Sequence, residues 1–316
     1  MKPMIKYRGG KSREIPNIML HIPRFSGRYV EPFFGGGALF FHLEPRTAII
    51  NDINAKLISF YRGVRDDYES LRTELNEIEK IYEENRKDFE LLKTQHPDER
   101  VEDKNEAIYY ELREMFNDIA PKKYSDALLY FYINKTAYSG MIRYNAKGEF
   151  NVPYGRYKHL NTSGITQSHK HLLQRSEIFN TDYSDIFNMC TAEDFVFLDP
   201  PYDCVFSDYG NDEYKEGFND DAHRKLAADF KNLPCKALMV IGRTKLTEEL
   251  YHGLIVDEYA KSYAVNIRNR FKSETTHIVI ANFKKNWEVE NRYEFAQAET
   301  SQLMLFEGLE PYGKNR

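Results

Sequence analysis

Short apolar segments of strand length occur near both ends of this chain, and a long charged region separates them. The segments at 28–33 (RYVEPF) and 47–52 (TAIIND) stand near the start. Four more return at the end of the sequence: 177–182 (EIFNTD), 194–199 (DFVFLD), 236–242 (KALMVIG) and 276–283 (THIVIANF). Apolar runs of this length that alternate with helical patterns are typical of an α/β sheet. The pattern therefore predicts one α/β core that is split by an insertion.

The intervening region has the pattern of long helices. Leu71, Leu75, Ile78 and Ile81 recur at three- and four-residue spacing, which indicates one apolar helix face. A later helical run leads into a loop rich in glycine and tyrosine, and the last thirty or so residues are polar and weakly patterned. We predict an α/β core from residues 1–65 and 165–285, a largely helical domain with a basic loop from residues 66–164, and a tail from residues 286–316.

Charge is distributed unevenly over these regions. The whole chain has a formal net charge of −5, which alone argues mildly against nucleic acid. Residues 66–114 hold 17 acidic and 8 basic side chains, whereas residues 134–175 hold 7 basic side chains and 1 acidic one. Because local charge attracts phosphates, the second segment is a candidate nucleic-acid interface, although an ordinary solvated face would have the same composition.

Several classes of protein do not fit the sequence. No apolar run is long enough to span a membrane, and the N-terminus lacks the apolar segment of a signal peptide, so we expect a cytoplasmic, nucleoid-associated protein of bacterial or phage-like type. Cys190, Cys204 and Cys235 form no C-x-x-C pair, and the nine histidines form no H-E-x-x-H pattern. We therefore predict neither disulfides nor a bound metal.

Two turns are rich in glycine. The first, at 31–40 (EPFFGGGALF), follows a predicted strand, where glycines let the backbone approach a ligand closely. Asp52 ends the next predicted strand, and an acid there can accept hydrogen bonds from ribose hydroxyls. The G-x-G-x-x-G spacing of nicotinamide enzymes is absent, because Phe40 stands where the third glycine would be. The second turn, at 6–12 (KYRGGKS), could bind an anion or form a flexible N-terminal turn.

The stretch FVFLDPPYDC at 195–204 ends an apolar strand in an acid, two prolines and a tyrosine. Prolines end strands, and open α/β sheets bind ligands at the carboxyl ends of their strands. A carboxylate and a proline-stiffened carbonyl can accept both hydrogens of an exocyclic amino group on an aromatic base, which draws its nitrogen toward tetrahedral geometry. A following tyrosine can stack on the base. We therefore predict that Asp199, Pro200 and Tyr202 are catalytic.

Taken together, the motifs KYRGGK, YVEPFFGGGALFF, NDIN, FNTDYSD and DPPY occur in an order that closely resembles the Dam-type class of DNA adenine-N6 methyltransferases. The segments YYELREMFN and INKTAYSGMIRYNAKGEFNVPYGRYK resemble the recognition region of that family. The resemblance covers about residues 4–283. It implies a Rossmann-like, S-adenosylmethionine-dependent methyltransferase core with an inserted, largely helical DNA-recognition domain.

S-adenosyl-L-methionine is the cofactor that this resemblance implies. The family commonly has tryptophan where this chain has Tyr7, and either ring can flank a purine. Cofactor contacts are implied for Tyr7, Lys11, Glu31, Gly35, Gly37, Asp52, Asp182, Tyr183 and Asp199.

Double-stranded DNA is the implied partner. Tyr138 would wedge into the duplex beside an extracted adenine, and Arg143 would read a guanine, since a bidentate arginine on guanine is the commonest specific major-groove contact. Members that read GATC often carry asparagine after the wedge tyrosine, whereas Ser139 follows it here, so GATC or a related short site is predicted. DNA contacts are predicted for Lys6, Tyr138, Ser139, Met141, Arg143, Asn145, Pro153, Arg156, Arg268 and Arg270.

The resemblance also implies a mechanism. The target adenine is flipped out of the duplex, because its N6 cannot be reached inside the stack, and it is methylated by direct in-line transfer without a metal. Two alternatives stay open at this point. The Asp-Pro-Pro-Tyr motif suits any exocyclic amine, so RNA or cytosine N4 could be the substrate, and a catalytically silent DNA-binding protein could have the same fold.

One feature of the tail is separate from this family. Gln302–Phe306 (QLMLF) resembles the pentapeptides with which bacterial replication and repair proteins dock into a sliding clamp. Its apolar side chains could instead pack onto the core.

Overall fold

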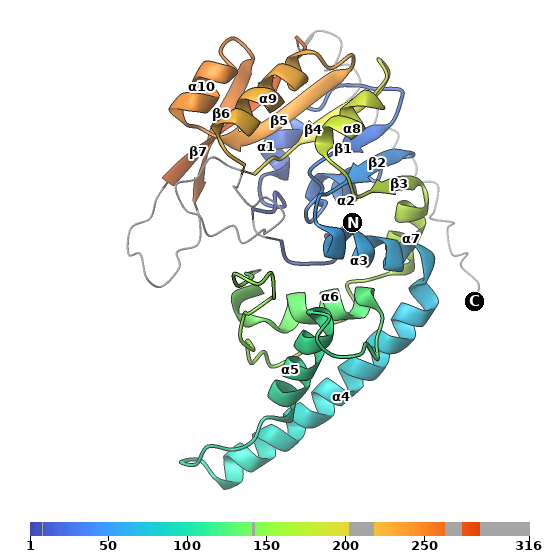
Figure 1. Ribbon diagram of the computed structural model, residues 1–316, viewed down its shortest axis with the longest axis vertical. Helices are drawn as coiled ribbons and strands as arrows, with labels where there is room; N and C mark the ends of the chain where they lie inside the picture. The colour runs from blue at the N-terminus through green and yellow to red at the C-terminus, as the bar shows by residue number, and fades with distance from the viewer. Residues whose placement is uncertain (8, 141–142, 202–217, 263–273, 285–316) are drawn as a thin grey trace, which may run out of the picture. The chain divides into compact units, whose positions relative to one another are not determined.

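The computed structural model describes residues 1–7, 9–140, 143–201, 218–262 and 274–284 of the chain. Its core is a seven-stranded mixed sheet with the order β3-β2-β1-β4-β5-β7-β6 (Figure 1). Strands β3, β2, β1, β4 and β5 are parallel, whereas β7 is antiparallel to both β5 and β6. The strands are β1 (Tyr29–Glu31), β2 (Ala48–Asn51), β3 (Ser176–Phe179), β4 (Phe195–Leu198), β5 (Lys236–Gly242), β6 (Ile255–Ser262) and β7 (Glu274–Ala281).

The central strands are short, and they are buried along their whole length. Every residue of β1, β2 and β4 is buried, as expected for parallel strands that are covered on both faces. The helices that accompany the sheet are α1 (Ile15–Met19), α2 (Ala38–Leu43), α3 (Ala55–Asp66), α7 (Gln167–Gln174), α8 (Tyr183–Asn188), α9 (Asp220–Lys231) and α10 (Lys245–Leu250). This arrangement confirms the predicted mixed α/β fold.

Three further helices follow α3 and lie on the side of α3 that faces away from the sheet (Figure 1). They are α4 (Tyr68–Gln95), α5 (Lys104–Phe116) and α6 (Asp126–Thr136), and α6 packs against both α3 and α5. The side chains of Asp103 and Ser125 accept hydrogen bonds from backbone N–H groups in the first turns of α5 and α6, which explains where these helices begin. Almost all of α6 is buried, because it lies between α3 and the two other helices.

Two details differ from the sequence-based expectation. Strand β6 was not predicted, because it lies at the edge of the sheet and its sequence is largely charged and polar (IVDEYAKS). On α4, Tyr82 is buried together with Leu71, Leu75 and Ile78, whereas Ile81 is only partly buried. The apolar face thus passes through a tyrosine, whose hydroxyl bonds the Tyr157 carbonyl at 2.7 Å.

The order of the strands brings four predicted site residues to one edge. Strand β1 lies between β2 and β4, so the chain passes to opposite sides of β1, and such a switch point opens a crevice at the carboxyl ends of the strands. Glu31 ends β1, while Asp52, Asp182 and Asp199 follow β2, β3 and β4. Among the described residues, no helix is both long and apolar enough to cross a membrane.

Candidate active site

The glycine turn after β1 is held in shape by Asp52. Gly35 and Gly37 have φ values of +48° and +62°, which residues other than glycine rarely adopt. One carboxylate oxygen of Asp52 accepts a hydrogen bond from Gly35 N at 2.8 Å, and the other accepts from Asn54 N at 2.9 Å. The hydroxyl of Tyr61, on α3, donates to the Gly35 carbonyl at 2.9 Å. Asp52 therefore joins the loops after β1 and β2 into one rigid unit.

The ring of Tyr7 lies against this turn. A Cβ atom added at Gly35 would be 2.8 Å from the Tyr7 ring, and one added at Gly36 would be 2.9 Å from the Tyr7 Cβ. Neither distance is possible for a real side chain, so the close approach requires glycine at both positions. The two glycine turns, which are separate in the sequence, thus form one surface at the carboxyl edge of the sheet.

Lys11 connects the N-terminal turn to the end of β4. Its Nζ is 2.5 Å from Asp199 Oδ1 and donates to the Gly9 carbonyl at 3.1 Å. The Lys11 side chain is only 2% exposed, whereas that of Asp199 is 22% exposed. The ion pair therefore fixes the carboxylate from its buried side and leaves part of it open. Pro200, the next residue, is buried.

Two more carboxylates lie close to this pair. Burial raises the pKa of Glu31 well above its ordinary value, the hydrogen bond from Tyr29 opposes that rise, and the charges of Asp199 and Asp52 add to it. Burial also raises the pKa of Asp52, against the two backbone hydrogen bonds that it accepts. A ligand that carries positive charge suits this edge of the sheet, because it would offset the cost of burying Glu31 and Asp52 and the repulsion of Glu31 by Asp199 and Asp52.

Asp182 and Tyr183 occupy the end of β3 in a different way. Asp182 caps α8 by accepting from Ser184 N at 2.9 Å. Tyr183 is 5% exposed and its hydroxyl donates to Asp229 at 2.9 Å, so most of its ring belongs to the core. The partly buried Phe33 packs against Tyr183, with ring centroids 5.3 Å apart, and the two side chains form a Phe33–Tyr183 cluster. Phe33 was not among the predicted residues, and its position just before the glycine turn was the available signal.

The predicted recognition loop is attached to the end of α6. The side chain of Tyr138 is 51% exposed, and its backbone N–H donates to the Pro153 carbonyl at 2.9 Å. Ser139 has a φ of +59°, an uncommon conformation for a residue with a side chain. The strand-like bridge between Ala137 and Tyr154 holds the two sides of the loop together. Tyr138 and Pro153, for which DNA contacts are predicted, are thus brought to the same place.

Arg143 and Asn145 have partners within this loop. Arg143 Nε donates to Asn151 Oδ1 at 2.8 Å. Asn145 Oδ1 accepts from the backbone N–H groups of Lys147 and Glu149 at 2.9 and 3.0 Å. Asn145 therefore shapes the turn at the tip of the loop, a role that the sequence did not reveal.

The loop and the N-terminal turn are joined through Asn134. Its side chain accepts from Lys6 N at 2.9 Å and donates to Lys6 O at 2.7 Å, which mimics one rung of a sheet. Lys6 Nζ lies 4.4 Å from the centre of the Tyr157 ring. Lys6 therefore stands between the glycine turns and the loop that carries Tyr138.

A family model for D12 class N6 adenine-specific DNA methyltransferases matches residues 7–267 of this sequence. The chain belongs to this family. The resemblance to Dam-type enzymes is thereby confirmed, and the enzyme is an adenine-specific DNA methyltransferase. Its seven-stranded mixed sheet is consistent with the methyltransferase fold.

Similar proteins cover almost the same length. The Type II methyltransferase M.CviBI of Paramecium bursaria Chlorella virus NC1A is 35% identical over 291 residues, 90% of this chain and 100% of that protein. The Type II methyltransferase M.MjaIII of Methanocaldococcus jannaschii is 30% identical over 90% of this chain and 99% of its own length. The DNA adenine methylase of Salmonella typhi is 30% identical over 86% of this chain and 90% of its own length.

S-adenosylmethionine, which this D12 family implies, fits the residues at the sheet edge. It carries a sulfonium, an ammonium and a ribose diol, and the glycine turn, the Tyr7 ring and the carboxylates of Glu31, Asp52 and Asp199 offer complementary groups. Among the described residues, no group of three or more His, Cys, Asp or Glu side chains could hold a metal ion.

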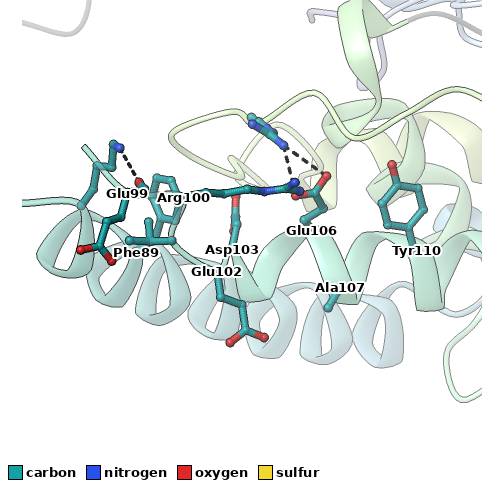
Figure 2. A pocket seen from close by; sticks show the side chains of 11 residues that line it. Phe89, Glu99, Arg100, Glu102, Asp103, Glu106, Ala107 and Tyr110 are labelled. Atoms are coloured by element: carbon teal, nitrogen blue, oxygen red, sulfur yellow. Dashed lines mark hydrogen bonds and ion pairs between the residues drawn. The ribbon is translucent and has the colours of Figure 1, made fainter. Parts of the chain in front are cut away.

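One predicted DNA contact of the methyltransferase is engaged elsewhere. Arg156, with a φ of +52°, places its guanidinium 3.3 Å from the carboxylate of Glu106 on α5. Both residues line a groove of about 400 Å³ between α4 and α5, together with Phe89, Asp103 and Tyr110 (Figure 2). Arg156 Nη2 makes these contacts and the Arg156 side chain is 62% exposed, so other N–H groups of the guanidinium can still reach a phosphate.

Several predicted residues lie outside the part of the chain that the structure describes. They are Tyr202, Met141, Arg268, Arg270 and the tail segment Gln302–Phe306. Their assignments stay predictions.

Proposed function

We propose that this methyltransferase moves a methyl group from S-adenosylmethionine to N6 of an adenine that is flipped out of duplex DNA, at GATC or a related short site. The observation that carries the proposal is the 2.5 Å ion pair between Lys11 and Asp199, set beside the glycine turn at the switch point of the sheet. Bound S-adenosylmethionine supplies an electrophilic methyl group, and the other requirements fall on residues of this chain.

Asp199 and the Pro200 carbonyl are the proposed acceptors for the two N6 hydrogens of the adenine. Accepting both hydrogens localises the nitrogen lone pair, which otherwise is delocalised into the purine ring. Lys11 fixes the direction of the Asp199 carboxylate before the base arrives, so that less reorganisation is needed during the reaction. Tyr202 is proposed to stack on the base.

Contacts with S-adenosylmethionine are proposed for Glu31, Gly35, Gly37 and Asp52. Tyr7 and the Phe33–Tyr183 cluster are proposed to flank the adenosine part of that cofactor. The segments 1–65 and 165–285 would then form the catalytic core, and the segment 66–164 would recognise DNA.

Tyr138 is suited to wedge into the duplex because its ring is large and half exposed at the end of helix α6. Docking of the tail at a sliding clamp is a separate proposal.

The recognition site can be read directly. We expect that expression in a host without DNA methylation produces N6-methyladenine at one short sequence, which long-read sequencing would map. An Asp199→Ala variant, expressed at the same level, provides the background. Methylation of cytosine N4 or of RNA alone, with unmodified adenine in DNA, would contradict the proposal.

Lys135 is a further basic residue near this surface that sequence reasoning missed. Burial lowers the pKa of Lys135 to about 8, and the charge of Lys6 contributes to that lowering. Its Nζ lies 5.2 Å from the centre of the Phe131 ring. The ammonium groups of Lys6 and Lys135 therefore lie close enough to repel each other, an arrangement that a phosphate would stabilise.

DNA affinity is accordingly expected to depend on pH in a range where lysines are usually insensitive. Below pH 8 Lys135 is mostly charged and attracts phosphate, and above pH 8 it is mostly neutral. We expect affinity to fall by about fivefold between pH 7 and pH 9.5, measured by fluorescence anisotropy at constant salt. The Lys135→Arg variant should lose this dependence, because arginine stays charged over the whole range. Equal pH profiles for the two proteins would rule out a role for Lys135.

A further inference from the structure

Glu14 connects the N-terminal turn to two distant strands. It lies just before α1, and its side chain is 6% exposed. Its Oε2 accepts a hydrogen bond from the Tyr259 hydroxyl at 2.7 Å and is 2.7 Å from His277 Nδ1. Tyr259 on β6 and His277 on β7 are cross-strand partners with ring centroids 5.8 Å apart. One carboxylate oxygen thus joins segments that are 245 and 263 residues apart.

The same turn carries Lys11. The Lys11 carbonyl accepts hydrogen bonds from the backbone N–H groups of Glu14 at 2.8 Å and Ile15 at 3.1 Å. A single tight turn therefore separates the anchored carboxylate of Glu14 from the ammonium group that holds Asp199. A displacement of Glu14 would also displace Lys11, because these two backbone hydrogen bonds fix the turn between them.

Tyr259 also lies close to the reactive edge of the sheet. Burial raises the pKa of Tyr259, and its hydrogen bond to Glu14, the charge of Glu14 and the charge of Asp199 raise the pKa further. The phenol therefore stays protonated and donates to Glu14. In the register of the sheet, His277 is paired with Gly242 at the carboxyl end of β5, which is the edge where Asp199 follows β4.

We propose that Glu14, Tyr259 and His277 are positioning residues for methyl transfer, and that they act by fixing Lys11 and, through it, the Asp199 carboxylate. The inference rests on the proposed role of Asp199 as the acceptor for the N6 hydrogens. A reacting carboxylate must be held to within about half an ångström, which a lysine with four rotatable bonds does not achieve without support. The buried glutamate supplies that support by tying the lysine's turn to two strands of the sheet.

The test is the Tyr259→Phe variant, which removes one hydroxyl and keeps the ring. We expect the single-turnover methylation rate, with both substrates bound beforehand, to fall about tenfold, while the KM for S-adenosylmethionine stays within about twofold. Tyr251→Phe is the matched control. Tyr251 is fully buried and its hydroxyl has no hydrogen-bond partner among the described residues, so its loss should leave the rate unchanged.

A double-mutant cycle separates positioning from simple support of the fold. If Tyr259 acts through Lys11, then Tyr259→Phe should cause no further loss of rate in a Lys11→Met background. If the two losses multiply, the proposal is wrong. Glu14→Gln is the second variant should Tyr259→Phe fail to fold, and the same non-additivity is expected for it.

Two negative results have different meanings. A wild-type enzyme that forms no N6-methyladenine would overturn the proposed function, and this inference with it. An active wild type together with a Tyr259→Phe variant of equal rate would overturn the positioning role alone.

Discussion

Replacement of Asp199 by alanine is expected to lower the single-turnover rate of adenine methylation by roughly a thousandfold, because the charged acceptor that we propose for the transition state is removed. DNA affinity should stay within about threefold, since phosphate contacts dominate it and Asp199 makes none of them. The two quantities are measured by methyl incorporation into a short duplex and by fluorescence anisotropy. Normal methylation by a folded Asp199→Ala protein would contradict the catalytic role that we propose for Asp199.

A stability effect must be separated from the effect on chemistry. Lys11 is almost fully buried, so removing its partner leaves an uncompensated charge, which we expect to cost about 3 kcal/mol of unfolding free energy. The Asp199→Ala, Lys11→Met double variant should recover much of this stability without recovering activity. Relative to Asp199→Ala, the double variant should therefore have a higher melting temperature and an equally low methylation rate.

Asp194, at the other end of β4, provides a matched control. Its side chain is 2% exposed and pairs with Arg28 at 2.8 Å. Burial alone would raise the pKa of Asp194, but the hydrogen bonds from Arg28 and from backbone N–H groups hold it at about 2, below the ordinary value of 3.8. The pair thus stabilises the fold above about pH 4, and the contribution is lost as the pH falls through 2. Asp194→Ala should therefore destabilise the protein at pH 7, while its folded fraction methylates DNA normally.

Local sequence patterns predicted the parts of this site that are contiguous in the chain. The glycine turn, Asp52 and the Asp199–Pro200 step each follow a buried strand, and the buried strands are the most regular pattern in the sequence. Once the strands are known, the parallel order brings their ends together. The ion pair of Lys11 with Asp199 was not predicted, because nothing local relates residues that are 188 positions apart.

The features that sequence reasoning missed depend on such distant contacts. Asn134 was only part of a helical run until the structure placed it against Lys6. Glu14 and His277 have no neighbours in the sequence that mark them, and β6 alternates too weakly to be recognised before its partner β7 is known. Tyr183 is a related case, since its motif indicated a ligand contact while its hydroxyl and most of its ring are used in the core.

The second large effect is expected for Gly35→Ala, and it tests whether the cofactor surface depends on the approach of the two glycine turns. The added methyl group would meet the Tyr7 ring at 2.8 Å, and alanine is unfavourable at a φ of +48°. The turn can relieve the clash only by moving Tyr7 or by breaking the bond from Gly35 N to Asp52. We expect affinity for S-adenosylmethionine to fall at least about thirtyfold by calorimetry, equivalent to about 2 kcal/mol.

Gly253→Ala is the control for backbone strain alone. Gly253 has a φ of +78°, and among the described residues, its two chain neighbours apart, no atom lies within 4 Å of the position that its Cβ would take. Alanine is strained by the left-handed conformation at both positions. Gly253→Ala should therefore lose about as much stability as that strain alone costs Gly35→Ala, and it should keep its affinity for S-adenosylmethionine. In a Tyr7→Ala background the steric part of the Gly35→Ala effect should disappear, because the atoms that it strikes are gone. Undiminished loss of affinity in that double variant would mean that the backbone conformation of the turn, and not its contact with Tyr7, shapes the cofactor surface.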